Sequence, residues 1–298
     1  RPSKADALRD VLEKVTLIKD VMVRSPNRAH IEILYDLSLE ALHKAHKFTD
    51  FLGLHRAWQK TLDISELNKQ FFKELANWYF WTIAQVKFPD GAPKDSEGTD
   101  SPSVIRMITR LVFVWFLKEK GLVPDELFNQ SDVKRLIHFE TGDASSYYKA
   151  ILQNLFFATL NQEMNTAKKS DNRKFRGKSK SGGRDQHYGV ANTYRYEDLM
   201  RLPAEMLALF ETVPFLNGGL FECLDDTEVT PAIRVDGFSD RADNQLLVPN
   251  QVFFSEEQDV DLNGTYGTKN KKYKVRGLID ILNRYKFTIA ENTPLEQE

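Results

Sequence analysis

The segment 101–121 is apolar on almost every face, and this constrains the fold more than any other feature of the sequence. An amphipathic helix would confine its large apolar side chains to one stripe. Ser101 can cap a first helical turn, and Pro102 would stand where a missing N–H costs nothing. Gly121 can end the helix in a left-handed conformation. We therefore expect a central buried helix, with the apolar residues Ile105, Met107, Ile108, Leu111, Val112, Val114, Trp115, Phe116 and Leu117.

Helical spacing of apolar residues also marks other stretches. It predicts helices over 30–47, 145–160, 196–212 (interrupted at Pro203) and 277–285. A further helix starts at the capping-box spacing of Asp63 and Glu66 and ends before Pro89. The aromatic side chains along this helix could stack on nucleic-acid bases, but packing in the protein core is the favoured interpretation.

After residue 222 the pattern changes to short segments with a period of two or with β-branched and aromatic residues. This predicts small strands over 233–237, 246–248 and 251–254, and an exposed excursion over 259–274. The expected fold is mainly α: an irregular multi-helix domain with a small β-containing part near the C-terminus. We expect three parts: a helical segment over 1–60 that could be the tail of a preceding domain, a helical domain over 61–222, and a mixed α/β segment over 223–298.

Composition excludes several classes of protein. The 298 residues are 41% hydrophobic and 28% charged, as in an ordinary globular protein. Cys223 has no second cysteine to pair with, which indicates a reducing, cytoplasmic setting but would also suit a secreted protein without disulfides. We expect it to be a small buried residue rather than a reactive thiol. The longest apolar run, 111–117, is far shorter than the roughly 20 residues that cross a bilayer, so no membrane partner is expected. Because the chain begins with Arg1 and ends without a helix cap, we expect it to be a fragment of a longer protein.

Positive charge is concentrated in one segment. Eight basic residues and one acid between 168 and 184 give this segment a net +7, so the rest of the chain, whose total is −2, carries −9. We expect a flexible loop over 165–189 that binds DNA phosphates without reading sequence, with Phe175 available to stack; a solvated insertion without a partner is an equal alternative. The expected DNA-binding residues, called the basic segment below, are Lys168, Lys169, Arg173, Lys174, Arg176, Lys178, Lys180 and Arg184.

Motifs for catalysis are scarce. Neither a phosphate-binding G-x-x-x-x-G-K-[ST] loop nor a G-x-G-x-x-G turn is present, and His43 and His46, three residues apart, lack a third metal ligand. Pro124-Asp125 followed by Asp132 and Lys134 matches the letters of a magnesium nuclease site, but such acids normally lie on strands. We therefore expect no catalytic and no metal-binding residues in this chain.

Several segments together resemble one family. The segments 108–124 (ITRLVFVWFLKEKGLVP), 147–156 (YYKAILQNLF) and 214–222 (PFLNGGLFE) resemble the helical region upstream of the catalytic domain in large bacterial adenine-specific DNA methyltransferases of the restriction-modification type. The segment 287–296 (FTIAENTPLE) resembles the join to that domain, and 67–81 resembles the helix after the nuclease part of fused restriction and modification enzymes. The family's (D/N/S)-P-P-(Y/F) motif and its glycine-rich cofactor turn are not found here.

The resemblance implies a helical connector that contacts double-stranded DNA and adjoins methyltransferase and possibly nuclease domains of a parent chain. The fragment itself would need no cofactor, whereas the parent would use S-adenosylmethionine, and Mg²⁺ if a nuclease is fused. The alternatives are a free-standing nuclease with Asp125, Asp132 and Lys134 at its site, or a protein interaction scaffold. The sequence leaves open whether the parent cleaves DNA and which site it would recognise.

Overall fold

The computed structural model describes residues 31, 34–61, 64–139, 145–169, 172–175, 192–216, 218–226, 229–241 and 244–285. Within 64–139, side chains are described from residue 69 onward. The chain divides into two compact units. Unit 1 comprises Arg1–Lys73 and Asn283–Lys286, and unit 2 comprises Glu74–Leu282 and Phe287–Glu298.

Unit 1 contains α2 (Leu39–His46), α3 (Phe51–Thr61) and the first half of α4 (Ile64–Ile83). The helix expected over 30–47 is broken before Leu39, because the Ser38 hydroxyl accepts a hydrogen bond from the Ala41 N–H and caps a new helix there. Helix α3 was not expected. Its first turn is capped by Asp50, whose carboxylate accepts from the Gly53 N–H at 2.6 Å. The Asp63 capping box lies outside the described residues.

Unit 2 contains α5 (Ser101–Glu119), which confirms the helix expected over 101–121. The N-cap position belongs to Asp100 rather than Ser101, and the Asp100 carboxylate accepts from the Phe88 N–H instead of capping the helix. Gly121 has the expected left-handed conformation, with φ of 70°. The helix is less deeply enclosed than expected, since Ile105 and Phe113 are 52% and 41% exposed.

The most deeply buried helix is η3 (Tyr147–Leu160), a π-helix at the position expected for 145–160. Every residue in it except Lys149 is buried. It is contacted by α7 (Pro203–Glu211), and α7 in turn contacts α6 (Gln130–Leu136). Pro203 begins α7 rather than interrupting a longer helix, as suits a residue that lacks an N–H. The remaining short helices are η2 (Asp125–Leu127), η4 (Glu197–Leu199), η5 (Gly219–Phe221), η6 (Asn250–Val252), α8 (Asn263–Tyr266) and α9 (Leu278–Arg284).

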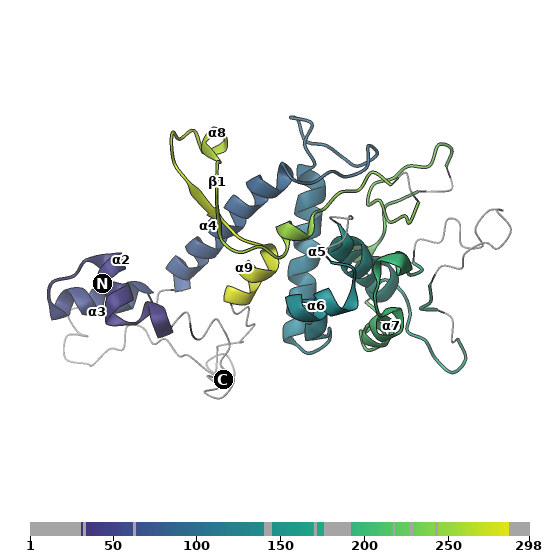
Figure 1. Ribbon diagram of the computed structural model, residues 1–298, viewed down its shortest axis with the longest axis horizontal. Helices are drawn as coiled ribbons and strands as arrows, with labels where there is room; N and C mark the ends of the chain where they lie inside the picture. Colours follow the sequence, from purple (N-terminus) through teal and green to yellow (C-terminus); the bar gives the residue numbers. More distant parts are fainter. Residues whose placement is uncertain are drawn as a thin grey trace, which may run out of the picture. The chain divides into compact units, whose positions relative to one another are not determined.

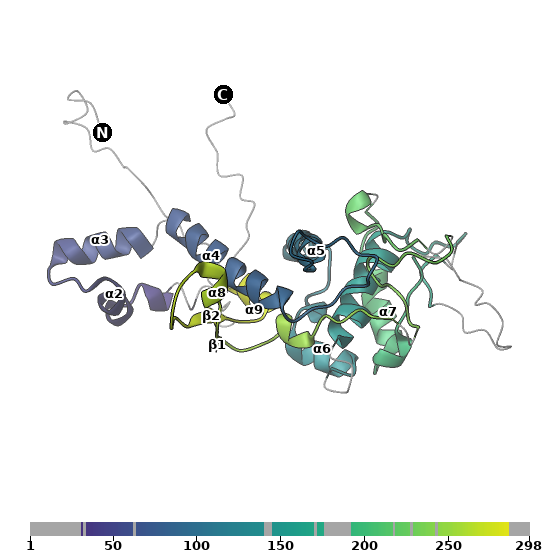
Figure 2. The same ribbon diagram turned by 90° about the horizontal axis from the view of Figure 1, so that it is seen from above.

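The β structure is not where the sequence predicted it. In the described part of unit 2, the sheet consists of β1 (Gln258–Val260) and β2 (Tyr273–Val275), antiparallel with Asp259 opposite Lys274. The two strands form the ends of the segment expected to be an exposed excursion, 259–274, and each extends one residue beyond it. Figure 1 and Figure 2 both show this hairpin and α8 beside α4, where the Tyr266 hydroxyl donates to Asn77 at 2.9 Å. The predicted strands are wrong: 251–254 begins in the η6 turn, and 233–237 and 246–248 make only isolated bridges.

One carboxylate explains the loss of the strand over 233–237. Asp225 accepts hydrogen bonds from four consecutive backbone N–H groups, those of Val235, Asp236, Gly237 and Phe238, at 2.6 to 3.0 Å. These donors are therefore not available to a neighbouring strand. The fold class is nevertheless confirmed, since the chain is mainly helical with a small two-stranded sheet towards its C-terminal end.

None of the described helices combines the length and the apolar character needed to cross a membrane.

Candidate functional site

The structure describes half of the basic segment. Lys168 and Lys169 are exposed, and the Lys169 ammonium lies 3.6 Å from the Glu163 carboxylate. Arg173 and Lys174 are also described, whereas the other four residues lie outside the described residues: Arg176, Lys178, Lys180 and Arg184.

Arg173 has a structural role, in contrast to the phosphate contact expected from the sequence. It is 4% exposed, and its guanidinium donates to the carbonyl oxygens of Val213 at 2.7 Å, Thr159 at 2.8 Å and Phe210 at 3.0 Å, and also to that of Gln162. These carbonyls lie at the C-terminal ends of η3 and α7, where helical N–H partners run out. Burial lowers the pKa of the Arg173 guanidinium.

The residues on either side of the stretch 176–191 lie next to each other in unit 2. Phe175 and Tyr194 form an isolated parallel bridge, in which the Tyr194 N–H donates to the Lys174 carbonyl at 3.0 Å. Their rings make an edge contact at 5.9 Å, and Tyr194 stacks on Phe210. Phe175 therefore contacts the core through Tyr194 instead of standing free to stack on a base.

The acids of the alternative nuclease site are not brought into a metal cluster. Asp125 lies in η2 with its side chain 81% exposed and 3.3 Å from the Lys118 ammonium, and Asp132 lies on α6, paired with Arg135 at 3.6 Å. Across the described ranges, no group of three or more His, Cys, Asp or Glu side chains is placed to hold a metal ion.

Cys223 lies in a setting that suppresses thiol chemistry. Burial, together with the carboxylates of Asp225 and Asp236, raises the pKa of the Cys223 thiol from 9.0 to about 12. The thiolate is the nucleophilic form, so this cysteine is unreactive at neutral pH.

A buried charge network that the sequence did not reveal lies beside Cys223. The Arg110 guanidinium, from α5, donates to the Asp236 carboxylate at 2.8 Å and to the carbonyls of Leu220 and Glu222 at 2.8 Å each. The other carboxylate oxygen of Asp236 accepts from the Leu224 N–H. Neither sequence periodicity nor motif spacing links α5 to Asp236, so sequence reasoning had no signal for this pair.

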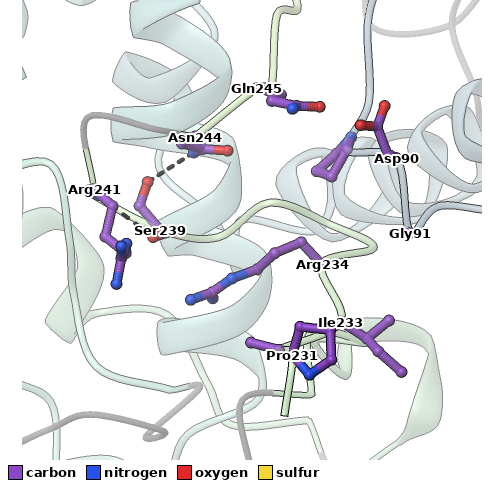
Figure 3. Close-up of a pocket in the computed structure, with 11 residues that line it drawn as sticks. Asp90, Gly91, Pro231, Ile233, Arg234, Ser239, Arg241, Asn244 and Gln245 are labelled. Atoms are coloured by element: carbon purple, nitrogen blue, oxygen red, sulfur yellow. Dashed lines mark hydrogen bonds between the residues drawn. The ribbon is translucent and has the colours of Figure 1, made fainter. Parts of the chain in front are cut away.

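The irregular segment that follows Asp225 lines an open cleft of about 540 Å³ (Figure 3). In Figure 3 the guanidinium ends of Arg234 and Arg241 lie on one side of the cleft, whereas Asp90 and Gln245 lie on the other. Turned so that its nitrogen donates, the Gln245 amide lies 3.1 Å from the Asp90 carboxylate. Pro231, Ala232 and Ile233 add apolar surface. The cleft thus combines a cationic side with a polar side, which suits an anionic ligand better than an apolar one.

Comparison with known proteins gives one match. The chain is 24% identical over 210 residues to the Methanocaldococcus jannaschii protein named "Putative type II restriction enzyme and methyltransferase RM.MjaORFECS2P". The matched residues are 70% of this chain and 12% of that protein, so the chain corresponds to a small part of its relative. No family model matches the sequence, and no solved structure matches it. The match supports a distant relationship to restriction-modification proteins.

Proposed function

We propose that this chain is a helical connector region of a restriction-modification DNA methyltransferase, and that it contacts DNA phosphates without an active site of its own. The observation that carries the proposal is the match over 70% of the chain to a protein named as both restriction enzyme and methyltransferase. The mainly helical architecture is compatible with this role.

In the parent protein, other domains of the same chain would supply the chemistry. A methyltransferase domain would bind S-adenosylmethionine and methylate adenine at N6, and a fused nuclease domain, where present, would use Mg²⁺. The chain described here would position those domains on one DNA duplex. Its setting would be the cytoplasm.

The contact to DNA is proposed to run through the basic segment apart from Arg173. Arg173 and the bridge between Phe175 and Tyr194 fix where the stretch 176–191 leaves unit 2. Since the rest of the chain is net negative, affinity for phosphate should come mainly from the remaining cations, Lys168, Lys169, Lys174, Arg176, Lys178, Lys180 and Arg184.

Salt dependence tests this proposal. Fluorescence anisotropy of a labelled duplex should give a slope of log K against log salt near about −4 to −5 if roughly four to six phosphates are neutralised, with little dependence on DNA sequence. Changing the four cations Arg176, Lys178, Lys180 and Arg184 to Gln should flatten the slope by several units.

A matched control removes four exposed cations elsewhere in unit 2, namely Lys120, Arg201, Lys269 and Lys272. Equal losses in both variants would contradict a role for the basic segment, because only general charge would then matter. Absence of binding by the unchanged chain at low salt would instead leave the scaffold alternative.

Plasmid cleavage with Mg²⁺ that Asp132→Ala abolishes would favour the nuclease alternative.

A further inference from the structure

We propose that the groove between α2 and α3 in unit 1 is a second DNA-contacting surface, at which Arg56 and Lys60 bind phosphates of the duplex backbone. This inference rests on the proposed function, because it takes DNA as the partner of the chain. It concerns unit 1, which contains no residue of the basic segment.

The groove lies where the end of α2 meets α3. Figure 1 and Figure 2 both show the two helices next to each other. The groove has a volume of about 380 Å³, and no acid is among the described residues that line it. Its polar lining comes from both helices, and the lining includes His46, Phe48, Gly53, Arg56, Gln59 and Lys60.

Helix α3 is held so that its two cations point away from the interior of unit 1. Its Ala57 is buried, and the Trp58 indole N–H donates to the Leu37 carbonyl at 3.2 Å, which fixes the rotation of the helix. One helical turn separates Arg56 from Lys60, so the two side chains lie on the same face. Both residues are exposed.

Arg56 and Lys60 are available to a ligand. Neither side chain makes a hydrogen bond, ion pair or ring contact with any residue that the structure describes. Asp50 is the only acid in the sequence between residues 44 and 61, and its carboxylate is occupied by the Gly53 N–H at 2.6 Å. Two cations one turn apart without an acid repel each other, so an anion between them is favourable.

The charge of this stretch indicates DNA as the partner. Residues 44–61 carry four cations and one acid, a net +3, whereas the chain outside this stretch and the basic segment carries −12. Arginine and lysine are both common ligands of phosphate. A protein partner would be expected to use the exposed apolar side chains of Phe51 and Leu52, but these two residues do not line the groove.

Close packing fixes the end of the groove at Phe48. A Cβ on Gly53 would lie 2.8 Å from the Phe48 Cβ, so a glycine lets α3 begin this close to the preceding turn. The Phe48 ring in turn makes an edge contact with the His43 ring of α2, with centroids 5.3 Å apart. A groove whose walls are already fixed lowers the entropic cost of holding a ligand.

The test compares Arg56→Gln/Lys60→Gln with Lys44→Gln/Lys47→Gln, which removes the same charge from exposed residues of unit 1 that do not line the groove. Fluorescence anisotropy with the full chain and a labelled duplex over about 50 to 200 mM salt measures binding. The groove variant should weaken binding about threefold to tenfold at low salt and reduce the salt slope by about one to two, and the control should change both much less.

A second pair of variants keeps both cations. Gln59→Glu places a carboxylate in the groove and should weaken binding by about threefold, whereas Gln59→Ala should leave it nearly unchanged. All the changed residues are exposed, so melting followed by circular dichroism should show folded variants. Should Arg56→Gln/Lys60→Gln unfold, the two Gln59 variants provide the test.

Two results would overturn the proposal. The first is duplex binding by Arg56→Gln/Lys60→Gln that is indistinguishable from binding by the control, which would leave this face of α3 to a protein partner. The second is binding of inorganic phosphate, measured by calorimetry, that requires both cations while the affinity for duplex does not. The groove would then be a site for free phosphate.

The same titrations separate this proposal from the proposed function. Loss of the salt slope in the basic-segment variant alone would overturn the groove and keep the proposed function. Loss in the groove variant alone would support the groove and move DNA contact away from residues 176–184. Losses in both variants would support both proposals, and if the unchanged chain does not bind duplex at low salt, both fail together.

Discussion

Asp236 holds the guanidinium of Arg110 at 2.8 Å, and the two side chains are only 1% and 2% exposed. The pair joins α5 to the irregular segment that forms the cleft. Arg110 also lies over the Phe157 ring, 4.8 Å from its centroid, so the charge is enclosed by aromatic surface as well. Removing one partner of so well buried an ion pair lowers the free energy of unfolding strongly, because the remaining charge is buried away from water.

We predict that Asp236→Ala lowers the free energy of unfolding by about 3 to 5 kcal/mol, because it leaves Arg110 charged, buried and without its carboxylate. Urea denaturation followed by circular dichroism measures the change. Asp125→Asn is the matched control, since its exposed pair with Lys118 is worth about 1 kcal/mol at most. A loss in Asp236→Ala no larger than in this control would mean that Arg110 finds another partner.

Arg173→Gln should destabilise unit 2 by about 2 to 4 kcal/mol, because a shorter neutral side chain leaves several buried carbonyls at the ends of η3 and α7 without donors. Lys169→Gln, a few residues away and exposed, should change stability by no more than about 0.5 kcal/mol. Thermal melts of the two variants give the comparison. If Arg173→Gln were neutral in stability yet weakened DNA binding, Arg173 would belong to the interface instead.

The Cys223 thiol should resist alkylation in the folded protein at pH 8 and react once urea unfolds the chain. Its pKa rises from 9.0 to about 12 on folding, so the folded state keeps the proton that the unfolded state loses. The contribution of this group to stability is therefore fully present below about pH 9 and is lost as pH rises toward 12. Mass spectrometry after iodoacetamide treatment measures the labelling, and rapid labelling without urea would show that the site is open.

The chain alone should transfer no methyl group to DNA, because the base-holding and cofactor-binding motifs of the resembled family are not found in its 298 residues. Incubation with labelled S-adenosylmethionine and mixed DNA checks this, with an active adenine methyltransferase as positive control. Incorporation above background would show that the chain has an active site and would contradict the connector proposal.

Elements whose stability is local were predictable from the sequence. The segments that became α5, η3 and α9 carry apolar residues at helical spacing, and this periodicity within the segment is the main sequence signal for a helix. Helix α3 was missed because its sequence contains Gly53 and mixes polar with apolar residues, and its cap depends on a single carboxylate from Asp50.

The errors arise where distant segments decide the outcome. The period-two pattern over 233–237 is typical of a strand, but the Asp225 carboxylate takes the N–H groups that a strand would need. Similarly, the charge of the basic segment was evident, whereas the burial of Arg173 depends on carbonyls from η3 and α7 that only the fold brings together. The cleft arginines were not singled out, because no spacing relates Arg234 and Arg241 to Asp90.

The anchoring of Arg173 and Tyr194 has a mechanical consequence. A force applied between Phe175 and Tyr194 acts on unit 2 through two adjacent contacts. One is the set of carbonyl oxygens that accept hydrogen bonds from Arg173, and the other is the Tyr194 ring stacked on Phe210. A pull there loads the C-terminal ends of η3 and α7 together, because Arg173 donates to the carbonyls of Thr159 in η3 and Phe210 in α7 and the Tyr194 ring stacks on Phe210. Tension that reaches Phe175 or Tyr194 would therefore be transmitted to both helices at once.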